Sequence, residues 1–420
     1  MEKVNYLRLV TVEEALSLIR QVPQVREVEE VSLEKALRRV LAEDLLSPED
    51  LPHFSRATMD GYAVRARDTF GSSPTMPGIL EVVGEIRMGE EVLDAIEPGK
   101  AMAISTGGML PKGSDAVLML EHTQLVDSGL IEVMRPVSVG ENVVTAGEDV
   151  KKGELLFKCG KRLRAQDQGL LAALGITKIR VKRRLRVGII STGDEVVDPH
   201  TSPPPGKIRD VNTYTLSGLV SSLKFLPHYL GRAKDQFSDL RALVEQGINE
   251  HDILLISGGS SVGLRDLTLK VLSSFNDYEL LCHGVMISPG KPTIISRIGE
   301  RLVFGLPGHV ASAFVIGLIL VRPAMRFISG MDWEEAKDYF SITAKVTRNT
   351  ESQPGREDYV RVKVFKKEGV YFAEPEFGKS GLISTLVKGD GLMKIPLNAE
   401  GVYQGENVEV IPIAPLLGDA

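Results

Sequence analysis

The sequence contains little that would stabilise a small secreted fold or bind nucleic acid. Among its 420 residues only Cys159 and Cys282 are cysteines. They lie far apart and have none of the spacings of a zinc or redox site, so we expect reduced structural thiols in a cytosolic protein. The formal net charge is −6 and the pI is about 5.8. General nucleic-acid binding, for which a basic surface is typical, is therefore excluded.

Membrane-spanning and export segments are also missing from the sequence pattern. The longest apolar run, residues 311–321, falls well short of the roughly 20 residues that cross a bilayer. The first residues, M-E-K-V-N, lack the apolar core of a signal peptide. We therefore expect a cytoplasmic protein without a membrane partner.

The length and composition indicate a soluble chain of several domains. A chain of 420 residues is too long for one ordinary hydrophobic core. With 43% hydrophobic and 25% charged residues, it is neither disordered nor fibrous.

The most informative segment is D-I-L-L-I-S-G-G-S-S-V-G-L-R-D at residues 252–266. Its branched apolar run predicts a buried strand of a parallel sheet, and the small residues predict a loop before a helix that begins near Asp266. This geometry directs backbone N–H groups and a helix N-terminus at an anion. Because Asp266 would repel a bare phosphate, the loop suggests a phosphate-bearing ligand together with a divalent cation.

A second strand ends in the same way. The apolar segment 185–190 is followed by S-T-G-D-E at 191–195. Since ligands collect at the carboxyl ends of strands in open α/β sheets, we expect the two loops to line one crevice. The segment S-P-G-K-P at 288–292 adds a cation, and V-F-G-L-P-G-H at 303–309 ends another strand and opens an apolar helix at 310–321.

The rest of the chain falls into distinct patterns. Residues 180–330 alternate strand and helix, which predicts a three-layer α/β domain entered through the basic stretch 178–186. Residues 339–413 show only short alternating segments and no competing helix, which predicts a small β-barrel. Residues 51–147 read as short strands between glycine and proline turns.

Helices are expected near the N-terminus and after the β-rich region. Thr11 and Glu14 form a capping-box pattern, and Ser32 is a plausible N-cap of a second short helix. A further helix is expected at 165–174, with Gly175 suited to end it.

These motifs resemble those of the molybdopterin molybdotransferase family, which includes MoeA and the gephyrin E domain. The matching segments in the α/β region are S-G-G-S-S-V-G-x-x-D, S-T-G-D-E, P-G-K-P-T and G-L-P-G. Outside it, the segment 57–63, the segment 105–117, and the G-E-N and G-E-D triplets at 140–142 and 147–149 also match. The resemblance runs from about residue 50 to the C-terminal region.

The resemblance implies a multidomain fold of α/β and β type. It implies an N-terminal helical segment (1–50) joined by 148–179 into a helical linker domain, and an inserted β-rich domain (51–147). An α/β molybdopterin-binding domain of the adenylyltransferase-like type (180–330) and a C-terminal β-barrel (335–420) would follow.

The resemblance also implies a reaction: insertion of molybdate into adenylylated molybdopterin with Mg²⁺-dependent release of AMP, in molybdenum cofactor biosynthesis. Adenylylated molybdopterin and molybdate would be the substrates. The expected partners are a second copy of the chain, a molybdopterin adenylyltransferase upstream and molybdoenzyme maturation factors downstream.

Four carboxylates match the acidic site residues of the family: Asp266, Glu195, Asp60 and Asp235. The resemblance assigns Mg²⁺ to Asp266 and Glu195, and brings Asp60 across a dimer interface into the crevice of the partner. From the residues alone, Asp266 is also compatible with a helix N-cap, Glu195 with a solvated loop acid and Asp60 with an Asp-Gly turn.

The ligand-binding residues implied by the resemblance form three groups. The glycine loops contribute Thr192, Gly193, Ser257, Gly258, Gly259, Ser261 and Gly263. The turn of the third motif contributes Pro289, Gly290 and Lys291. Arg361, Ser380 and Ser312 match residues offered to molybdate, an oxyanion suited to arginine donors, and Thr106 matches a threonine of the interface pocket.

The chain departs from the family pattern near the oxyanion site. Gly284 and Ser288 stand where many members carry lysines, and His309 and Val310 replace an Asn-Pro pair. Compensation of the lost positive charge by His283 or His309 and insertion of tungstate are the alternatives. Because a lone histidine is more often a structural residue than a ligand, neither histidine is included in the predicted site. Two other hypotheses are an adenylyltransferase-type activity of the α/β domain and a non-enzymatic scaffold or cofactor-binding role.

Overall fold

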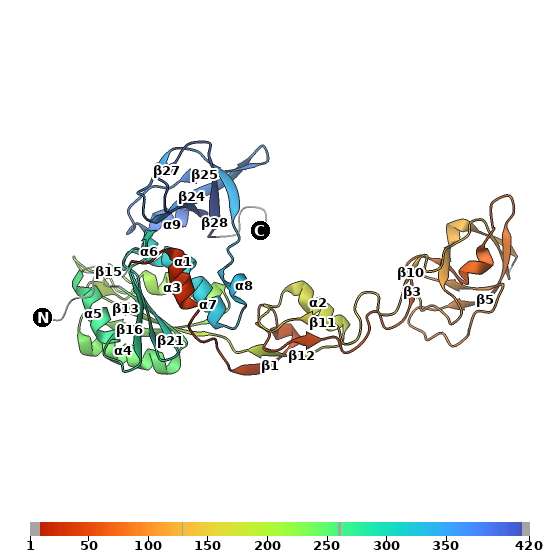
Figure 1. The fold of residues 1–420 in the computed structure, drawn as a ribbon, viewed down its shortest axis with the longest axis horizontal. Coiled ribbons are helices and arrows are strands. Elements are labelled where there is room, and N and C mark those ends of the chain that lie inside the picture. The colour runs from red at the N-terminus through yellow and green to blue at the C-terminus, as the bar shows by residue number, and fades with distance from the viewer. Residues whose placement is uncertain (1–8, 128, 259–261, 414–420) are drawn as a thin grey trace.

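The structure is a computed structural model that describes residues 9–127, 129–258 and 262–413, with the backbone alone at 262–265. It forms four bodies in an extended arrangement (Figure 1). The C-terminal barrel lies on the α/β domain, a small linker domain follows, and the β-rich domain stands at the far end of the molecule. The predicted multidomain fold is confirmed.

The α/β domain is built on a six-stranded mixed sheet in the order β16-β13-β17-β21-β20-β18. Strands β16, β13, β17 and β21 are parallel, and β20 and β18 run antiparallel to their neighbours. The strands are β13 (Arg186–Thr192), β16 (Leu226–Ala233), β17 (Ile253–Ser257), β18 (Tyr278–His283), β20 (Ile294–Ile298) and β21 (Arg301–Leu306), with a pair β14 (Val196–Val197) and β15 (Ile208–Arg209) beside them. The helices are α3 (Asn212–Ser222), α4 (Phe237–Glu250), α5 (Val262–Leu272), α6 (Val310–Ile316), π-helix η4 (Gly317–Val321) and α7 (Arg322–Ile328).

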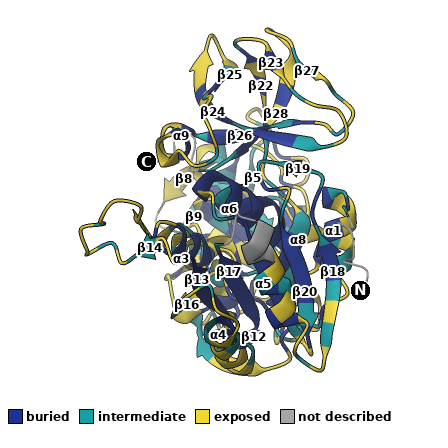
Figure 2. Cartoon of the chain, turned by 90° about the vertical axis from the view of Figure 1, so that its left-hand side faces the viewer, coloured by how far each residue is buried: buried dark blue, intermediate teal, exposed yellow. Residues whose placement is uncertain are grey.

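Strand β17 shows why the domain has three layers. All five of its residues are buried. Because successive side chains of a strand point to opposite faces, Ile253 and Leu255 join the core under α3, α6 and α7, whereas Leu254 and Ile256 join the core under α4. A continuous apolar strand therefore requires helices on both faces, as the sequence predicted. Figure 2 shows the sheet and α6 as the buried centre of the domain.

The apolar helix is longer than predicted. Helices α6, η4 and α7 form one continuous helix, Val310–Ile328, of 19 residues with mean hydropathy 1.7. Its length and composition would suffice to cross a membrane, but 78% of its most apolar window is buried inside the protein. Its residues belong to the largest hydrophobic core together with the sheet. It is the core helix of a soluble protein.

The segment 1–50 is divided between two bodies. Helix α1 (Val12–Ile19) has the predicted capping box: Thr11 Oγ1 accepts from the Glu14 N–H at 3.1 Å, and Glu14 Oε2 accepts from the Thr11 N–H at 2.7 Å. Its buried face packs into the core of the α/β domain. The following residues instead build the linker domain, because β1 (Val28–Ser32) pairs with β12 (Lys178–Lys182).

The linker domain contains less helix than predicted. The expected helix after Ser32 is only the 3-10 turn η1 (Leu33–Lys35), and Ser32 makes no capping bond. The predicted helix α2 (Ala165–Ala173) is present and ends before Gly175 at φ 67°. Strands β2 (Leu45–Leu46) and β11 (Leu155–Phe157) complete this body.

The β-rich domain carries a six-stranded sheet in the order β7-β4-β6-β5-β9-β8. Its elements are β3 (Arg56–Ala57), β4 (Gly61–Val64), η2 (Ala66–Thr69), β5 (Gly78–Ile86), β6 (Lys100–Ile104), β7 (Ala116–Met119), η3 (Leu120–His122), β8 (Thr123–Asp127), β9 (Leu130–Val133) and β10 (Val143–Val144). Strand β3 pairs with β10 where the chain enters and leaves the domain.

The C-terminal region is a closed barrel in the order β24-β25-β22-β28-β26, because β26 pairs back with β24. Its elements are β22 (Ile342–Val346), β23 (Thr350–Glu351), β24 (Glu357–Lys367), β25 (Val370–Pro375), α9 (Ile383–Lys388), β26 (Gly391–Ile395), β27 (Gly401–Val402) and β28 (Asn407–Pro412). Helix α8 (Trp333–Lys337) precedes the barrel and packs against α7. The predicted barrel is confirmed, but the expectation of no helix was wrong. Helix α9 has six residues, too few to show helical periodicity. Strand β19 (Ile287–Ser288) of the α/β domain pairs with β24 and joins the two bodies.

A buried ion pair lies at the amino ends of the parallel strands, opposite their carboxyl ends. Asp252, 4% exposed, accepts two 2.8 Å bonds from Arg183 and one from the Arg186 N–H. Burial opposes ionisation of Asp252, but these bonds and the charges of Arg183 and Arg301 lower its pKa. A lowered carboxyl pKa stabilises the fold above the unfolded pKa of about 3.9, and this contribution is lost as pH falls through the folded pKa.

We therefore expect Asp252→Asn to destabilise the α/β domain by about 3 kcal/mol at pH 7, because Arg183 would lose its buried partner. The difference should shrink as pH falls below about 4, because the carboxyl group is then protonated in the unfolded state, and it should disappear once pH passes the lowered folded pKa. Urea unfolding at both pH values measures this. As a control, Glu279→Gln removes the half-exposed pair with Arg297 and should cost less than about 1 kcal/mol.

Candidate functional site

The two glycine loops meet at the carboxyl ends of adjacent strands. Strands β13 and β17 pair directly, so the loops after Thr192 and Ser257 start side by side. Gly258 has φ 137°, and a Cβ atom there would lie 2.2 Å from Thr192 Oγ1. Only glycine allows this approach, because any side chain would collide with Thr192 and strain the backbone.

A cavity of ≈ 160 Å³ opens at this edge. Both glycine loops contribute to its wall, as does the β14–β15 segment, which projects from the domain in Figure 2. The start of α3, the start of α6 and a C-terminal loop complete it. The lining includes Ser191, Thr192, Glu195, Asp210, Asn212, Ser257, Gly258, Gly308, His309, Gly381 and Ile383. The predicted common crevice therefore exists and is also lined by the barrel domain.

Buried polar atoms without partners surround this crevice. Ser257 is 2% exposed and Asn212 is 9% exposed. Asn212 Nδ2 donates to the Gly308 carbonyl at 2.9 Å, but its Oδ1 and the Ser257 Oγ find no hydrogen-bond partner among the described residues. Leaving such atoms unsatisfied costs about 1–3 kcal/mol each, and this cost disappears when a ligand supplies the partner.

Carboxylates gather beside the loops. Asp235, just after β16, accepts from the Asp194 N–H at 3.4 Å, while its Oδ1 is buried without a partner in the described part of the chain. Burial and the charges of Asp194 and Glu195 raise the pKa of Asp235. Glu195 is exposed and its carboxylate folds over Gly193, where a Cβ atom would lie 2.7 Å from Oε2. Lys207 Nζ donates to the Asp194 carbonyl at 2.6 Å, but within the described ranges none of the carboxylates of Asp194, Glu195 and Asp235 forms an ion pair.

The loop after β17 differs from the prediction in one respect. Helix α5 begins at Val262, so Gly263 lies inside it and Asp266 is its fifth residue. Asp266 is exposed and does not cap the helix N-terminus. Gly259 and Ser261 lie outside the described residues. Asp210, which lines the cavity, accepts from the Thr213 N–H at 3.1 Å and caps the first turn of α3.

The C-terminal loop before α9 brings further candidates to the crevice. Ser380 Oγ and His309 Nδ1 are 2.9 Å apart, and the Ala311 N–H donates to the Ser380 carbonyl at 3.0 Å. Arg361 on β24 is 7% exposed, donates to the Gly378 carbonyl at 2.6 Å, and has no ion-pair partner among the described residues. Its Nε is buried without an acceptor. An anion would satisfy this group.

The other predicted residues of the α/β domain do not line the cavity. Ser312 is buried in the first turn of α6. Pro289 follows a cis bond, and Gly290 (φ 127°) packs against Ile316. Lys291 is exposed and does not line the cavity. The turn that carries these three residues directly follows β19, which pairs with the barrel.

Asp60 and Thr106 form a separate site on the β-rich domain. Asp60 Oδ1 accepts from the Thr106 N–H at 2.7 Å and from Thr106 Oγ1 at 2.9 Å, and these bonds lower the pKa of Asp60. Figure 1 shows that this domain lies at the end of the molecule remote from the α/β domain. Within one chain, the structure does not bring Asp60 to the crevice.

The carboxylates fit a magnesium ion that takes its remaining ligands from a substrate. No group of three His, Cys, Asp or Glu side chains within the described ranges is arranged to hold a metal. Magnesium is typically held by one or two carboxylates together with waters and substrate phosphates, so a complete protein cage is not required. The unpartnered Oδ1 of Asp235 and the raised pKa of this carboxyl group indicate that a cation would stabilise the cluster.

Family models match three parts of the chain: the MoeA N-terminal region (domain I and II) at residues 10–175, the "Probable molybdopterin binding domain" at 188–326 and the MoeA C-terminal region (domain IV) at 343–413. A molybdopterin biosynthesis protein of Methanocaldococcus jannaschii is 41% identical over 395 residues, 92% of each chain. The chain belongs to the MoeA family.

The other relatives agree with this assignment to the MoeA family. A molybdopterin molybdenumtransferase of Haemophilus influenzae is 32% identical over 413 residues, covering 98% of this chain and 100% of the relative. The crystal structure of a MoeA protein from Pyrococcus horikoshii superposes with a TM-score of 0.80 at 37% identity, covering 97% of this chain and 100% of that chain. The family consists of transferases of molybdenum cofactor biosynthesis, and the predicted resemblance is confirmed.

Two residues of the MoeA crevice were missed or set aside in the sequence analysis. Asn212 was passed over, although its place at the start of a helix after Asp210 was a usable signal. His309 was weighed but left outside the predicted site, because a lone histidine is more often structural. The structure places it at the N-cap of α6, against Ser380 and in the cavity wall.

The raised pKa of Asp235 predicts a trade of stability for function. A carboxyl group whose folded pKa lies above the unfolded value stabilises the fold when protonated, and this contribution is lost as pH rises through the folded pKa. At pH 7, without divalent cations, Asp235→Asn should therefore raise the thermal unfolding midpoint. Mg²⁺ should stabilise the wild type more than the variant. Transferase activity should fall at least about tenfold.

The control is Asp277→Asn, an exposed acid at the opposite edge of the sheet. It should change neither the midpoint nor the response to Mg²⁺. Equal midpoints for wild type and Asp235→Asn at pH 7 would contradict the strain inferred for Asp235.

Proposed function

We propose that the chain inserts molybdate into adenylylated molybdopterin with magnesium-dependent release of AMP, in the cytoplasm. The observation that carries this proposal is the crevice itself, where the two glycine loops meet beside the carboxylates of Glu195 and Asp235. Within the described residues, the buried Ser257 Oγ and Asn212 Oδ1 of this crevice have no hydrogen-bond partner. Backbone N–H groups of such loops bind phosphate, and the carboxylates require a cation before an anion can approach.

The residues divide the work by chemistry. The hydroxyl groups of Thr192 and Ser257 can donate hydrogen bonds to a pyrophosphate over the loops. Asn212 Oδ1 can accept a hydrogen bond from an N–H donor of the pterin. Glu195 and Asp266 would hold the magnesium ion, with Asp235 beside them. That ion supplies neutralisation of the phosphate charge and Lewis acidity toward the departing phosphate.

Molybdate would be held by the barrel side of the crevice. Arg361 has an unsatisfied Nε, and Ser380 is held against His309. His309 also offers an explanation of one family departure, because its imidazole lies beside Ser380 and can offer a ring N–H to an oxyanion where Asn-Pro is absent. Gly284 and Ser288, which stand where many members carry lysines, supply no charge. Ser312, Lys291 and the Pro289–Gly290 turn would contribute to the molybdate-binding side of the crevice. Tungstate is the alternative oxyanion.

The reaction is tested by single turnover. Enzyme loaded with adenylylated molybdopterin should release AMP when molybdate and Mg²⁺ are added, and should incorporate the metal into the pterin. Parallel incubations with tungstate determine the metal preference. Adenylylation of molybdopterin from ATP without molybdate would instead support the adenylyltransferase alternative.

We expect Asp266→Ala to reduce molybdate-dependent AMP release by at least about 100-fold, because the cation would lose a ligand next to the pyrophosphate. Because the side chain of Asp266 is exposed, its removal should not unfold the protein. An unchanged thermal unfolding midpoint of the variant would verify this. The matched control is Asp239→Ala on α4. Wild-type turnover by Asp266→Ala would remove this residue from the reaction.

The position of Asp60 and Thr106 supports a homodimer in which each crevice is completed by the partner subunit. In this arrangement Asp60→Ala and Asp266→Ala inactivate different halves of a shared site. Subunits of the two inactive variants, unfolded and refolded together, should regain about a quarter of wild-type activity, because half of the dimers would be mixed and each would hold one intact site. Activity of the mixture no higher than that of either variant alone would contradict shared sites. A molybdopterin adenylyltransferase upstream and maturation factors downstream would supply and accept the pterin.

A further inference from the structure

A second and larger cavity lies at the opposite edge of the sheet from the crevice. Its volume is ≈ 1080 Å³, and it separates the linker domain from the α/β domain. One wall consists of β1 and η1, and the other of the chain entering β13 and the turn before β16. Arg186 and Leu226 in this wall are the first residues of their strands, whereas the crevice lies beyond the last residues of β13 and β17.

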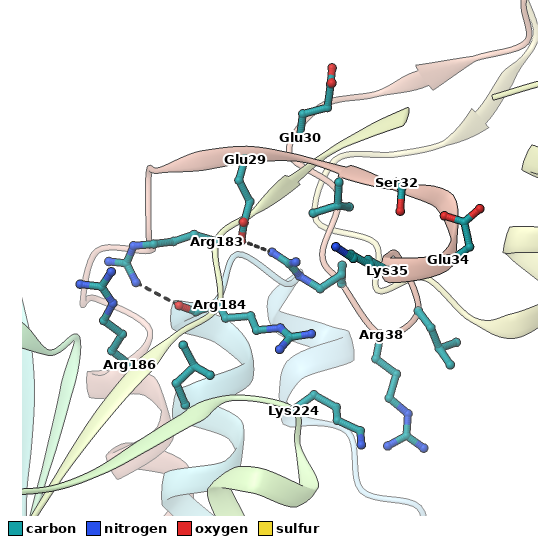
Figure 3. A pocket seen from close by; sticks show the side chains of 14 residues that line it. Glu29, Glu30, Ser32, Glu34, Lys35, Arg38, Arg183, Arg184, Arg186 and Lys224 are labelled. Carbon is teal, nitrogen blue, oxygen red and sulfur yellow. Dashed lines mark hydrogen bonds and ion pairs between the residues drawn. The ribbon is translucent and has the colours of Figure 1, made fainter. Parts of the chain in front are cut away.

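The cavity is strongly basic, although the whole chain is acidic. Figure 3 shows Lys35, Arg38, Arg184, Arg186 and Lys224 around the opening. These five residues come from both walls. The basic stretch at residues 178–186, which the proposed reaction does not use, supplies two of them.

Two further arginines of the wall are already neutralised. Arg39 donates to Glu29 at 2.5 Å, and Arg183 is paired with Asp252. The acids of the wall are also engaged, since Glu30 pairs with Lys178 at 3.1 Å and a bond from Ser32, with the nearby charge of Lys35, lowers the pKa of Glu34. The remaining positive charge is therefore not cancelled by the wall.

Four cations have no partner of their own. In the part of the chain that the structure describes, no hydrogen bond or ion pair engages the side chains of Arg38, Arg184, Arg186 and Lys224. Four uncompensated cations around one concavity repel one another, and an anion between them would remove that repulsion.

Two of these cations stand on strained backbone. Arg38 has φ 62° and Lys224 has φ 66°, in the left-handed region that side chains other than glycine rarely adopt. Lys224 occupies the position after the α3 C-cap, where the Lys224 N–H donates to Ser221 O and the Phe225 N–H to Val220 O. Glycine is the usual residue at this position. Strained cations on both walls of one cavity point to selection for the side chain rather than for the fold.

We infer that this cavity binds a small molecule carrying a chain of two or three phosphate groups. Arginine forks match phosphate oxygens in pairs, and several cations are needed to offset the charge of a polyphosphate. The cavity is concave and has the size of a small-molecule site, which favours a compact ligand over an extended acidic peptide. A bound polyphosphate would join the linker domain to the α/β domain and hold the angle at which the β-rich domain is carried.

The test uses the variants Arg38→Gly and Lys224→Gly, separately and together. Glycine removes the cation and accepts the left-handed backbone, so folding should be preserved or improved. Inorganic triphosphate is titrated calorimetrically into the full chain with divalent cations chelated, which disfavours binding at the carboxylate crevice. We expect each substitution to weaken binding about tenfold or more, and the wild-type affinity to fall with added salt.

Glu368→Gly is the matched control, because Glu368 has φ 51° in the barrel and carries no cation. It relieves strain elsewhere and should leave triphosphate binding unchanged. Parallel titrations with orthophosphate and with polyglutamate identify the ligand class, and both should bind more weakly than triphosphate.

Several results would overturn the inference. These are no binding of triphosphate to the wild type, equal binding to the double variant, or tighter binding of polyglutamate. Light scattering adds one more, since conversion of a dimer to a monomer by the double variant would show that the cavity is an interface between copies of the chain.

Discussion

The contact between Gly258 and Thr192 determines the geometry of the crevice. It brings the loop after β17 against the end of β13, closer than any side chain at position 258 would permit. The two strands are paired, and all of their residues except Arg186 are buried, so separation of their carboxyl ends would disrupt the core. The starts of both glycine loops and the carboxylate of Glu195 therefore line the same small cavity. A pyrophosphate held together with a cation, as proposed above, would fit this combination of groups.

Several buried polar atoms near this end of the sheet lack a partner. Ser257 and Asn212 belong to the α/β domain and Arg361 belongs to the barrel, and each has a buried polar atom with no hydrogen-bond partner in the part of the chain that the structure describes. Such atoms destabilise the free protein, and Asp235 adds charge that its neighbours disfavour. The packed cores on both faces of the sheet compensate for this cost. A ligand that supplied the missing hydrogen bonds would therefore stabilise this end of the sheet.

The extended arrangement places two predicted site residues far from the crevice. Asp60 and Thr106 are bonded to each other on the β-rich domain, far from the crevice of the same chain. The linker domain sets the distance, and its junction with the α/β domain contains the basic cavity with Arg38 and Lys224. The orientation of the β-rich domain depends on this junction, because the linker lies between the two bodies.

Features that depend on neighbouring residues could be predicted from the amino-acid sequence alone. They are the capping box at Thr11, the buried strand 253–257, the barrel strands and the glycine loops. Buried strands can be recognised locally because successive residues point to opposite faces of the sheet. Loop glycines can be recognised locally because glycine tolerates a positive φ. Only the tertiary structure placed His309 against Ser380, split the segment 1–50 between two bodies and opened the basic cavity. These features depend on contacts between residues far apart in the chain, and such contacts cannot be predicted from the local spacing of residues.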